Sequence, residues 1–268
     1  MNVTSIMYHD VVDAGAYDVS GFEGADAALY KVDREQFKMH LSAIAAAVED
    51  QPISVLDLLT KRRERTPLLV TFDDGGISAY THVTEMLDRL GWPGHFFVTA
   101  GYIDKPGFLT KQHIQDIHRR GHIIGSHSLS HPERMSFCSR KEISREWRQS
   151  LDLISDIIGS KTRVASVPGG FYSRKVAEQA AEAGVEALFT SEPTIRSHVV
   201  GGCLVLGRYT VQRWMSPAAV AALVSGQGFA RSKQVLLWNV KKVSKRLGGT
   251  RYLRMRKLLT QKTVGRDA

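Results

Sequence analysis

Residues 68–76 read LLVTFDDGG, an apolar run that ends in two adjacent aspartates and a glycine turn. Such a run is typical of a buried strand in a parallel sheet. Asp73 and Asp74 then lie at the carboxyl end of that strand, which is the functional face in α/β barrels. Neighbouring carboxylates repel each other and lose hydration on burial, so a cation is the expected partner. Because Asp-Gly also forms ordinary turns, this run alone leaves a simple turn as the alternative.

Two further strand ends carry motifs of the same kind. HIIGSHSLSHP, residues 122–132, supplies His127 and His131, two imidazoles that can converge on one ion from a turn. Two histidines and one carboxylate, with open coordination positions, are the usual ligands of a hydrolytic metal site. VASVPGGFYS, residues 164–173, ends in glycines that let backbone N–H groups approach an oxyanion, although Pro-Gly is also a common turn dipeptide.

Strand-like apolar runs and helical patterns alternate along the rest of the chain, as in βα units around a parallel sheet. The expected strands are Ser5–His9, Leu68–Phe72, His95–Ala100, His122–Gly125, Arg163–Val167, Ala187–Thr190 and Cys203–Val211. Helices are expected over Arg34–Val48, Lys111–Arg120 and Arg174–Ala183, after a capping box at Ser139 and Glu142, and after Ser216-Pro217. Seven strands fit a barrel-like closure, so we predict one α/β barrel over residues 1–230.

Positive charge is concentrated at the C-terminal end. Residues 231–268 contain 12 of the 36 Lys and Arg and one of the 27 Asp and Glu, which leaves 24 basic and 26 acidic residues in 1–230. The charges are therefore +11 and −2. We expect a basic helical extension that lies on an anionic membrane or polysaccharide, each basic residue near a membrane contributing about 1 kcal/mol. A solvated helix face is the alternative, and nucleic acid is less favoured because no recognition motif accompanies the charge.

Other features of the sequence exclude several classes of protein. Two cysteines, Cys138 and Cys203, are too few for a disulfide framework or a cysteine-rich metal site. The opening MNVTSIMYHD lacks the basic stretch and apolar run of a secretory signal, and the sequence has no 18-residue apolar segment. We therefore expect a cytoplasmic protein that can associate peripherally with a membrane through its basic extension.

The stretch from Val12 to Tyr30 does not fit the alternation of strands and helices. It is rich in Gly, Ala and Asp, and it is longer than most connections in compact domains. Long loops often cover an active site, so we expect Tyr17, Phe22 and Tyr30 to wall a substrate cleft. A surface loop without such a role is the alternative.

TFDDG at 71–75, HSLSHP at 127–132 and a later strand-end Pro-Gly motif, in this order, resemble the polysaccharide deacetylase family, which is carbohydrate esterase family 4 with its NodB-homology domain. MYHDVV, GHFFVT and RRGHIIGSH also fit, so the resemblance extends from about residue 5 to residue 170. It implies a distorted (β/α)7 barrel. It also implies a hydrolase that uses metal-activated water to remove N-acetyl groups from a polysaccharide or a lipid-linked amino-sugar precursor. The metal in such enzymes is typically zinc, sometimes cobalt or nickel.

The resemblance also implies roles for single residues. Asp73 matches the general base, and Asp74, His127 and His131 match the metal ligands. Ser128 matches the small polar residue that shapes the histidine loop. We group it on the substrate and oxyanion side of the site with Pro168, Gly169 and Gly170.

The chain departs from the family pattern in two places. Many members carry an arginine in the third motif that pairs with the catalytic aspartate, but residues 166–168 read SVP, and Arg163 or Arg208 could substitute from a neighbouring strand. The later Leu-x-His motif that supplies the general acid is absent, which leaves His9, His198 or a water at the metal. These departures resemble a divergent branch associated with bacterial exopolysaccharide, in which VPGG replaces the arginine motif.

Two other kinds of function stay open on the sequence. One is a sugar-binding module that keeps the barrel and the metal but has lost turnover, as the missing arginine and histidine suggest. The other is an O-acetyl esterase or a lipid-linked sugar deformylase at the membrane, which the basic extension motivates.

Overall fold

In the computed structural model of the chain, residues 1–61 and 64–240 are described. Within them, a nine-stranded sheet has the order β11-β1-β4-β5-β6-β7-β8-β10-β9. All neighbouring strands are parallel except β9 and β10. The strands are β1 (Thr4–Tyr8), β4 (Leu68–Phe72), β5 (Gly94–Val98), β6 (Ile123–Ser126), β7 (Val164–Ser166), β8 (Ala187–Phe189), β9 (His198–Val200), β10 (Cys203–Leu206) and β11 (Tyr209–Thr210). A separate parallel pair is formed by β2 (Val11–Val12) and β3 (Val32–Asp33).

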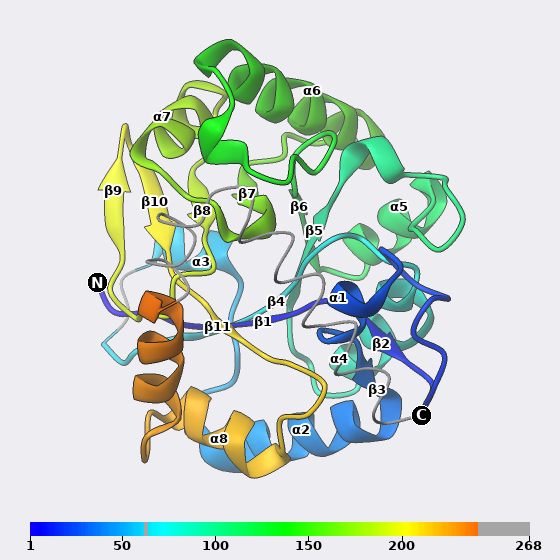
Figure 1. The fold of residues 1–268 in the computed structure, drawn as a ribbon, viewed down its shortest axis with the longest axis vertical. Helices are drawn as coiled ribbons and strands as arrows, with labels where there is room; N and C mark the ends of the chain where they lie inside the picture. The colour runs from blue at the N-terminus through cyan, green and yellow to red at the C-terminus, as the bar shows by residue number, and fades with distance from the viewer. Residues whose placement is uncertain (62–63, 241–268) are drawn as a thin grey trace.

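The longer helices lie around the periphery of this sheet (Figure 1). The helices of the described residues are α1 (Ala25–Ala28), α2 (Arg34–Ala47), α3 (Val55–Thr60), α4 (Thr84–Asp88), α5 (Lys111–Arg119), α6 (Arg140–Ile158), α7 (Arg174–Glu182) and α8 (Pro217–Ser225). The predicted caps are confirmed, since side chains that accept first-turn amides begin the helices at Asp33, Thr110, Ser139, Ser173 and Ser216. These caps satisfy amides that have no partner within the helix.

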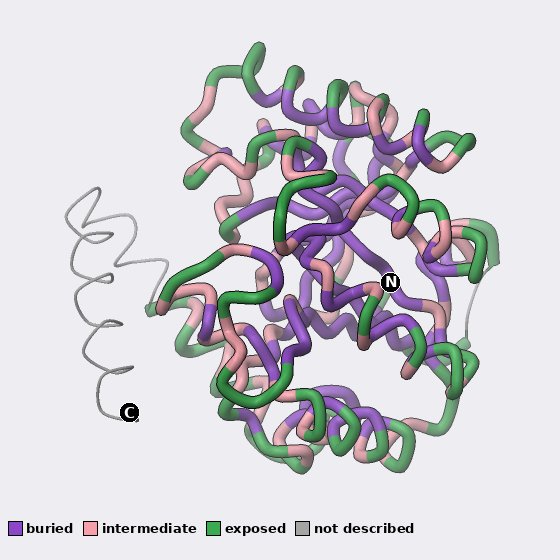
Figure 2. The backbone as a smooth tube through the Cα atoms, turned by 90° about the vertical axis from the view of Figure 1, so that its right-hand side faces the viewer, coloured by how far each residue is buried: buried purple, intermediate pink, exposed green. Residues whose placement is uncertain are grey.

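The strands are buried on both faces because helices cover the outside and side chains fill the inside. Every residue of β1, β4 and β5 is buried, and Figure 2 shows buried backbone through the interior with exposed segments at the periphery. Such double burial explains why LLVTF reads as a continuous apolar run rather than an alternating one. The expected α/β barrel is confirmed as a curled parallel sheet wrapped by helices.

The expected strand Cys203–Val211 is wrong, because the chain breaks it at Gly207 and Arg208. β10 pairs with β8 and β11 pairs with β1, so two residues carry the chain from the next-to-last strand at one end of the sheet order to the edge strand at the other end. This crossing is possible only because the sheet is curled. Gly207 is required there, since a Cβ would lie 2.4 Å from the carbonyl oxygen of Glu192. Apolar residues on both sides of the break make the stretch resemble one strand in sequence.

The first ten residues of the expected basic extension, 231–240, are helical and contact the barrel. The guanidinium of Arg231 donates to Leu223 O at 2.7 Å and Val224 O at 2.9 Å, and Gln234 exchanges two hydrogen bonds with the backbone of Thr210. Residues 241–268, which contain most of the predicted extension, lie outside the described residues. Of the helices described, none is long and apolar enough to cross a membrane.

Candidate metal and catalytic site

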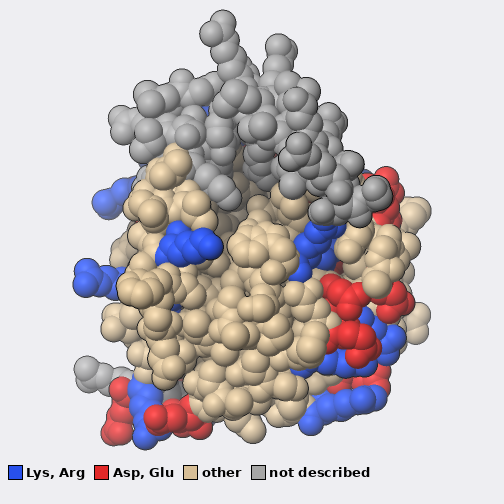
Figure 3. All heavy atoms as spheres, turned by 60° about the horizontal axis from the view of Figure 1, so that its bottom comes forward, with Lys and Arg blue, Asp and Glu red and all other residues tan. Residues whose placement is uncertain are grey.

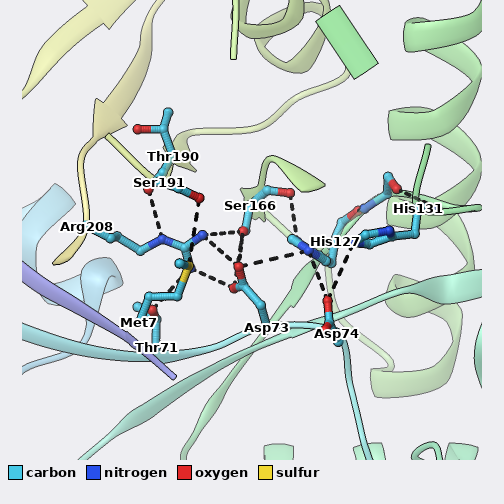
Figure 4. Close-up of polar contacts among 12 residues, drawn as sticks. Met7, Thr71, Asp73, Asp74, His127, His131, Ser166, Thr190, Ser191 and Arg208 are labelled. Carbon is cyan, nitrogen blue, oxygen red and sulfur yellow. Dashed lines mark hydrogen bonds and ion pairs between the residues drawn. The ribbon is translucent and has the colours of Figure 1, made fainter. Parts of the chain in front are cut away.

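The motifs noted in the sequence meet at the carboxyl ends of the parallel strands (Figure 4). Asp73 and Asp74 follow β4, His127 follows β6, and Ser166 ends β7. Arg208 lies in the break between β10 and β11. Because parallel strands end at the same edge of a sheet, a curled sheet brings these side chains from distant parts of the sequence into one cluster.

Asp74, His127 and His131 converge as a candidate ligand group. One ligand atom from each lies within 4.8 Å of the others. Nε2 of His127 is 3.4 Å from Asp74 Oδ1, and Nε2 of His131 is 3.5 Å from the same oxygen. His127 Nδ1 lies 3.1 Å from the carbonyl oxygen of Ser166, and when Nδ1 donates that bond the lone pair of Nε2 points into the cluster. Two imidazoles and a carboxylate therefore fit a divalent metal such as zinc.

The backbone of this cluster adopts unusual conformations. Among the described residues other than glycine, four have positive φ, and three of them are Asp74 (76°), Ser128 (66°) and His131 (56°). The left-handed region is unfavourable for residues with a Cβ, and such residues concentrate at active sites and ligand clamps. Their coincidence with the candidate ligands supports a functional role for the cluster.

Asp73 is paired with Arg208, which resolves the choice that the sequence leaves open. Arg208 Nη1 and Nη2 donate to Asp73 Oδ1 and Oδ2 at 2.6 and 2.8 Å, and both side chains are almost completely buried. Ser166 Oγ lies 3.2 Å from both oxygens of the same carboxylate. Arg163 instead pairs with Glu186 at the surface. Ser166 belongs to the SVP stretch that replaces the usual arginine motif. It thus contacts Asp73 together with Arg208.

Both aspartates are buried but favour the ionised state. Burial raises the pKa of Asp73, yet the charges of Arg208 and His127 outweigh it and hold this pKa below its usual range. Burial likewise raises the pKa of Asp74, but its hydrogen-bond contact with His127 and the neighbouring histidines outweigh burial and hold this pKa below its usual range. Burial lowers the pKa of His131, which favours the neutral imidazole that binds metals.

The two histidines that the sequence offers as general acid lie in different surroundings. His9 follows β1 and is close enough for its charge to act on both Asp73 and Asp74. Its Nδ1 atom is buried and has no hydrogen-bond partner among the described residues. His198 lies exposed on the edge strand β9, where its Nε2 is 3.1 Å from the hydroxyl of Tyr172.

The residues placed on the substrate and oxyanion side occupy two different settings. Pro168–Gly170 forms a short 3-10 turn directly after β7, with φ of 62° at Gly169 and 67° at Gly170. These angles explain the two glycines. Ser128 is fully buried, and its Oγ accepts the backbone N–H of His131 at 3.1 Å. Ser128 therefore acts within the histidine loop, whereas an oxyanion role for the glycines stays a prediction.

The stretch between β2 and β3 packs against the site. The ring of Phe22 lies 4.8 Å from the ring of His131, and the ring of Tyr30 lies 4.8 Å from that of His9. Tyr17 instead packs against the guanidinium of Arg213. Two of the three aromatic residues expected to wall a cleft thus contact candidate site residues.

Sequence reasoning missed the residue that holds this stretch together. Lys31 is 1% exposed, and its Nζ donates to the carbonyl oxygens of Tyr17, Ser20 and Phe22 at 2.5, 2.6 and 2.5 Å. All three ammonium protons are therefore used by one loop. A single lysine beside a short strand gives no signal of this role in the sequence.

Two imidazoles and a carboxylate at the strand ends of a curled parallel sheet define an α/β barrel protein with a candidate hydrolytic metal site. Comparison with known proteins makes the class specific. Residues 60–188 match the family model described as polysaccharide deacetylase. YxkH of Bacillus subtilis (strain 168), provisionally named as a polysaccharide deacetylase, is 24% identical over 198 residues, which are 72% of this chain and 70% of YxkH.

Two further proteins are similar to parts or most of the chain. The peptidoglycan-N-acetylmuramic acid deacetylase PdaA of the same organism is 29% identical over 136 residues, which are 50% of this chain and 49% of PdaA. The Streptococcus pyogenes deacetylase PplD, solved in complex with acetate, shares the fold with a TM-score of 0.68 at 18% identity, over 81% of this chain and 96% of PplD. Through residues 60–188 the chain matches the polysaccharide deacetylase family, whose members are hydrolases of carbon–nitrogen bonds.

Proposed function

We propose that this protein removes N-acetyl groups from the amino sugars of a polysaccharide, such as an exopolysaccharide, or from its lipid-linked precursor. The observation that carries the proposal is the convergence of Asp74, His127 and His131 beside the buried carboxylate of Asp73. The family match over residues 60–188 supports deacetylation in general. The relative PdaA, named for N-acetylmuramic acid, supports the N-acetyl bond in particular.

Asp74, His127 and His131 would hold a divalent metal, for which zinc is the first choice and cobalt or nickel are alternatives. When bound, such a metal polarises an amide carbonyl and acidifies water. When His127 Nδ1 donates to Ser166 O, Nε2 is free to coordinate. Three protein ligands leave coordination positions open for water and substrate.

Asp73 is the proposed general base. Its carboxylate is ionised, and Arg208 and Ser166 fix its orientation through four contacts. An oriented carboxylate can take the proton of the attacking water as the tetrahedral oxyanion forms. Backbone N–H groups near Gly169 are proposed to stabilise that oxyanion.

His9 is the proposed general acid. It acts electrostatically on both aspartates, and its side chain is only half-buried, which would let the ring reach the leaving amine. His198 lies on the exposed edge strand and is less suited to the role. Acetate and a free amino sugar are the products.

The test measures acetate release from N-acetylglucosamine oligomers with metal-stripped and zinc-reloaded protein. Activity should require reloading, and His127→Ala with His131→Ala should abolish metal binding, whereas His82→Ala at the surface should not. Unchanged metal content in the double variant would contradict the site assignment. Bound metal without acetate or formate release would instead indicate a sugar-binding protein, and release from O-acetylated substrates alone would indicate an esterase.

A membrane surface is the proposed location of a lipid-linked substrate. Phe229, Leu236 and Leu237 are 86%, 65% and 46% exposed, directly before the most basic part of the chain. Figure 3 shows a wide uncharged area in the lower middle of the face over α2 and α8, with Lys and Arg side chains above it and charged side chains of both signs at its edges. Apolar side chains next to basic residues are what an anionic lipid surface binds.

Sedimentation with anionic phosphatidylglycerol vesicles tests this location. The full chain should sediment, and a chain that ends at Val240, which keeps the contacts of Arg231 and Gln234 with the barrel, should bind less. Neutral phosphatidylcholine vesicles serve as the control. Equal binding of both chains to anionic vesicles would exclude the basic residues from membrane attachment.

A further inference from the structure

The loop that carries the two histidines, residues 127–131 (HSLSH), has an unfavourable backbone conformation that needs contacts from outside the loop. Ser128 and His131 both adopt left-handed conformations, which are unfavourable for residues that have a Cβ. Both imidazoles must nevertheless point at Asp74 from positions four residues apart. Contacts from outside the loop must therefore stabilise this arrangement.

Backbone and serine groups satisfy three amides of the loop. His127 N donates to Val98 O at 2.8 Å, which continues the pairing of β6 with β5. Ser128 N donates to Ser126 Oγ at 3.0 Å, and His131 N donates to Ser128 Oγ at 3.1 Å. The two central amides, those of Leu129 and Ser130, have no partner of this kind.

A single carboxylate satisfies the two central amides. Leu129 N and Ser130 N donate to Glu146 Oε2 at 3.0 and 2.8 Å, and the Ser130 hydroxyl donates to Glu146 Oε1 at 2.8 Å. One glutamate side chain thus binds three donors from two consecutive residues. Those residues lie between the two histidines.

Glu146 is placed for this contact by the packing of α6. Its side chain is 3% exposed, and it forms a long ion pair of 3.9 Å with Arg145. A buried carboxylate is costly unless it is hydrogen-bonded, so its position here depends on the loop amides. One helical turn further on, Ser150 Oγ lies 2.6 Å from Ser126 Oγ at the start of the loop. The same face of α6 therefore holds the loop at two points.

We propose that Glu146 is a positioning residue for metal binding. Through the amides of Leu129 and Ser130 it fixes the histidine loop so that both imidazoles face Asp74 before a metal arrives. Its carboxylate binds residues 129 and 130, which lie between the two histidines, so its charge would also favour a cation at the cluster. The proposal rests on the proposed function of the triad, although Glu146 itself contacts neither metal nor substrate.

The experiment compares full-length wild type with Glu146→Ala and Glu146→Gln. Zinc affinity is measured by competition with a chromophoric chelator, and amide hydrogen exchange at Leu129 and Ser130 is measured on the metal-free proteins. Glu146→Ala should weaken zinc binding by about 10–100-fold, the range known for residues that orient metal ligands. It should also accelerate exchange at both amides. Asp152→Asn, at an exposed position of the same helix, is the control and should change neither quantity.

The glutamine variant separates positioning from charge and guards against misfolding of the alanine variant. Its amide oxygen can still accept both N–H groups, so it should keep slow exchange at Leu129 and Ser130 and lose less zinc affinity than Glu146→Ala. A lower melting temperature with unchanged zinc affinity would reduce Glu146 to a stabilising residue and overturn the proposal. If wild type itself bound no zinc, the proposed function would fail, whereas the exchange rates would still decide whether Glu146 orders the loop.

Discussion

Replacing Arg208 with Met tests whether the pair with Asp73 organises the site. Arg208 is completely buried, and its guanidinium donates to both carboxylate oxygens of Asp73, to Thr190 O, to Thr71 Oγ1 and to Ser166 Oγ. Methionine fills much of the same volume but donates no hydrogen bond. The substitution therefore leaves Asp73 buried at 4% exposure without its main counter-charge.

Removal of one partner from a buried ion pair costs about 3–5 kcal/mol. Most domains are stable by about 5–15 kcal/mol, so Arg208→Met should remove a large part of the free energy of unfolding. The cost arises chiefly from the isolated charge. Asp73→Asn in the same chain should therefore recover part of it, and the double variant should lose about 2 kcal/mol less than the two single losses added together.

Urea unfolding of metal-free proteins at pH 7 measures these free energies without a contribution from bound metal. Arg163→Met is the matched control, because Arg163 pairs with Glu186 at the surface with side chains 41% and 43% exposed. Such a pair contributes at most about 1 kcal/mol. If Arg208→Met cost no more than the control, or if the two losses simply added, the pair would not have the role that its geometry indicates.

Three further predictions concern other parts of the molecule. Burial lowers the pKa of His95 to about 4. Between pH 6.5 and 4 the unfolded chain therefore binds a proton that the folded chain does not. The free energy of unfolding should fall by about 3 kcal/mol as the pH decreases through that window. Urea unfolding at several pH values checks this, and His95→Gln should flatten the profile. Lys31→Met leaves three loop carbonyls without their donor. It should raise KM for sugar oligomers and speed proteolysis between residues 13 and 30, while zinc affinity stays constant. An unchanged KM would show that the loop does not contact substrate. His9→Ala should lower kcat by about 100-fold or more with metal retained, as expected for loss of a general acid, whereas His198→Ala should leave kcat unchanged; the reverse result would exchange the two assignments.

The sequence alone determined which residues lie at the strand ends and at which residues the helices begin. The strand before Asp73 and the caps at Asp33, Thr110 and Ser139 depend on local periodicity and on hydrogen bonds within one turn, which a sequence displays directly. Asp74, His127 and His131 were identified together because their motifs each follow an apolar strand. The roles of these residues remain proposals that metal binding can test.

The tertiary structure alone decided which distant residues pair. Arg208 and Asp73 are 135 positions apart, and they meet because the chain crosses from β10 to β11 at Gly207 and Arg208. Lys31 and Glu146 are an ordinary lysine and an ordinary helical glutamate in sequence, and their burial gives them their roles. Local patterns reveal the strand ends, but the curl of the sheet and the packing of α6 against the histidine loop arise from long-range contacts, which no short stretch of sequence records.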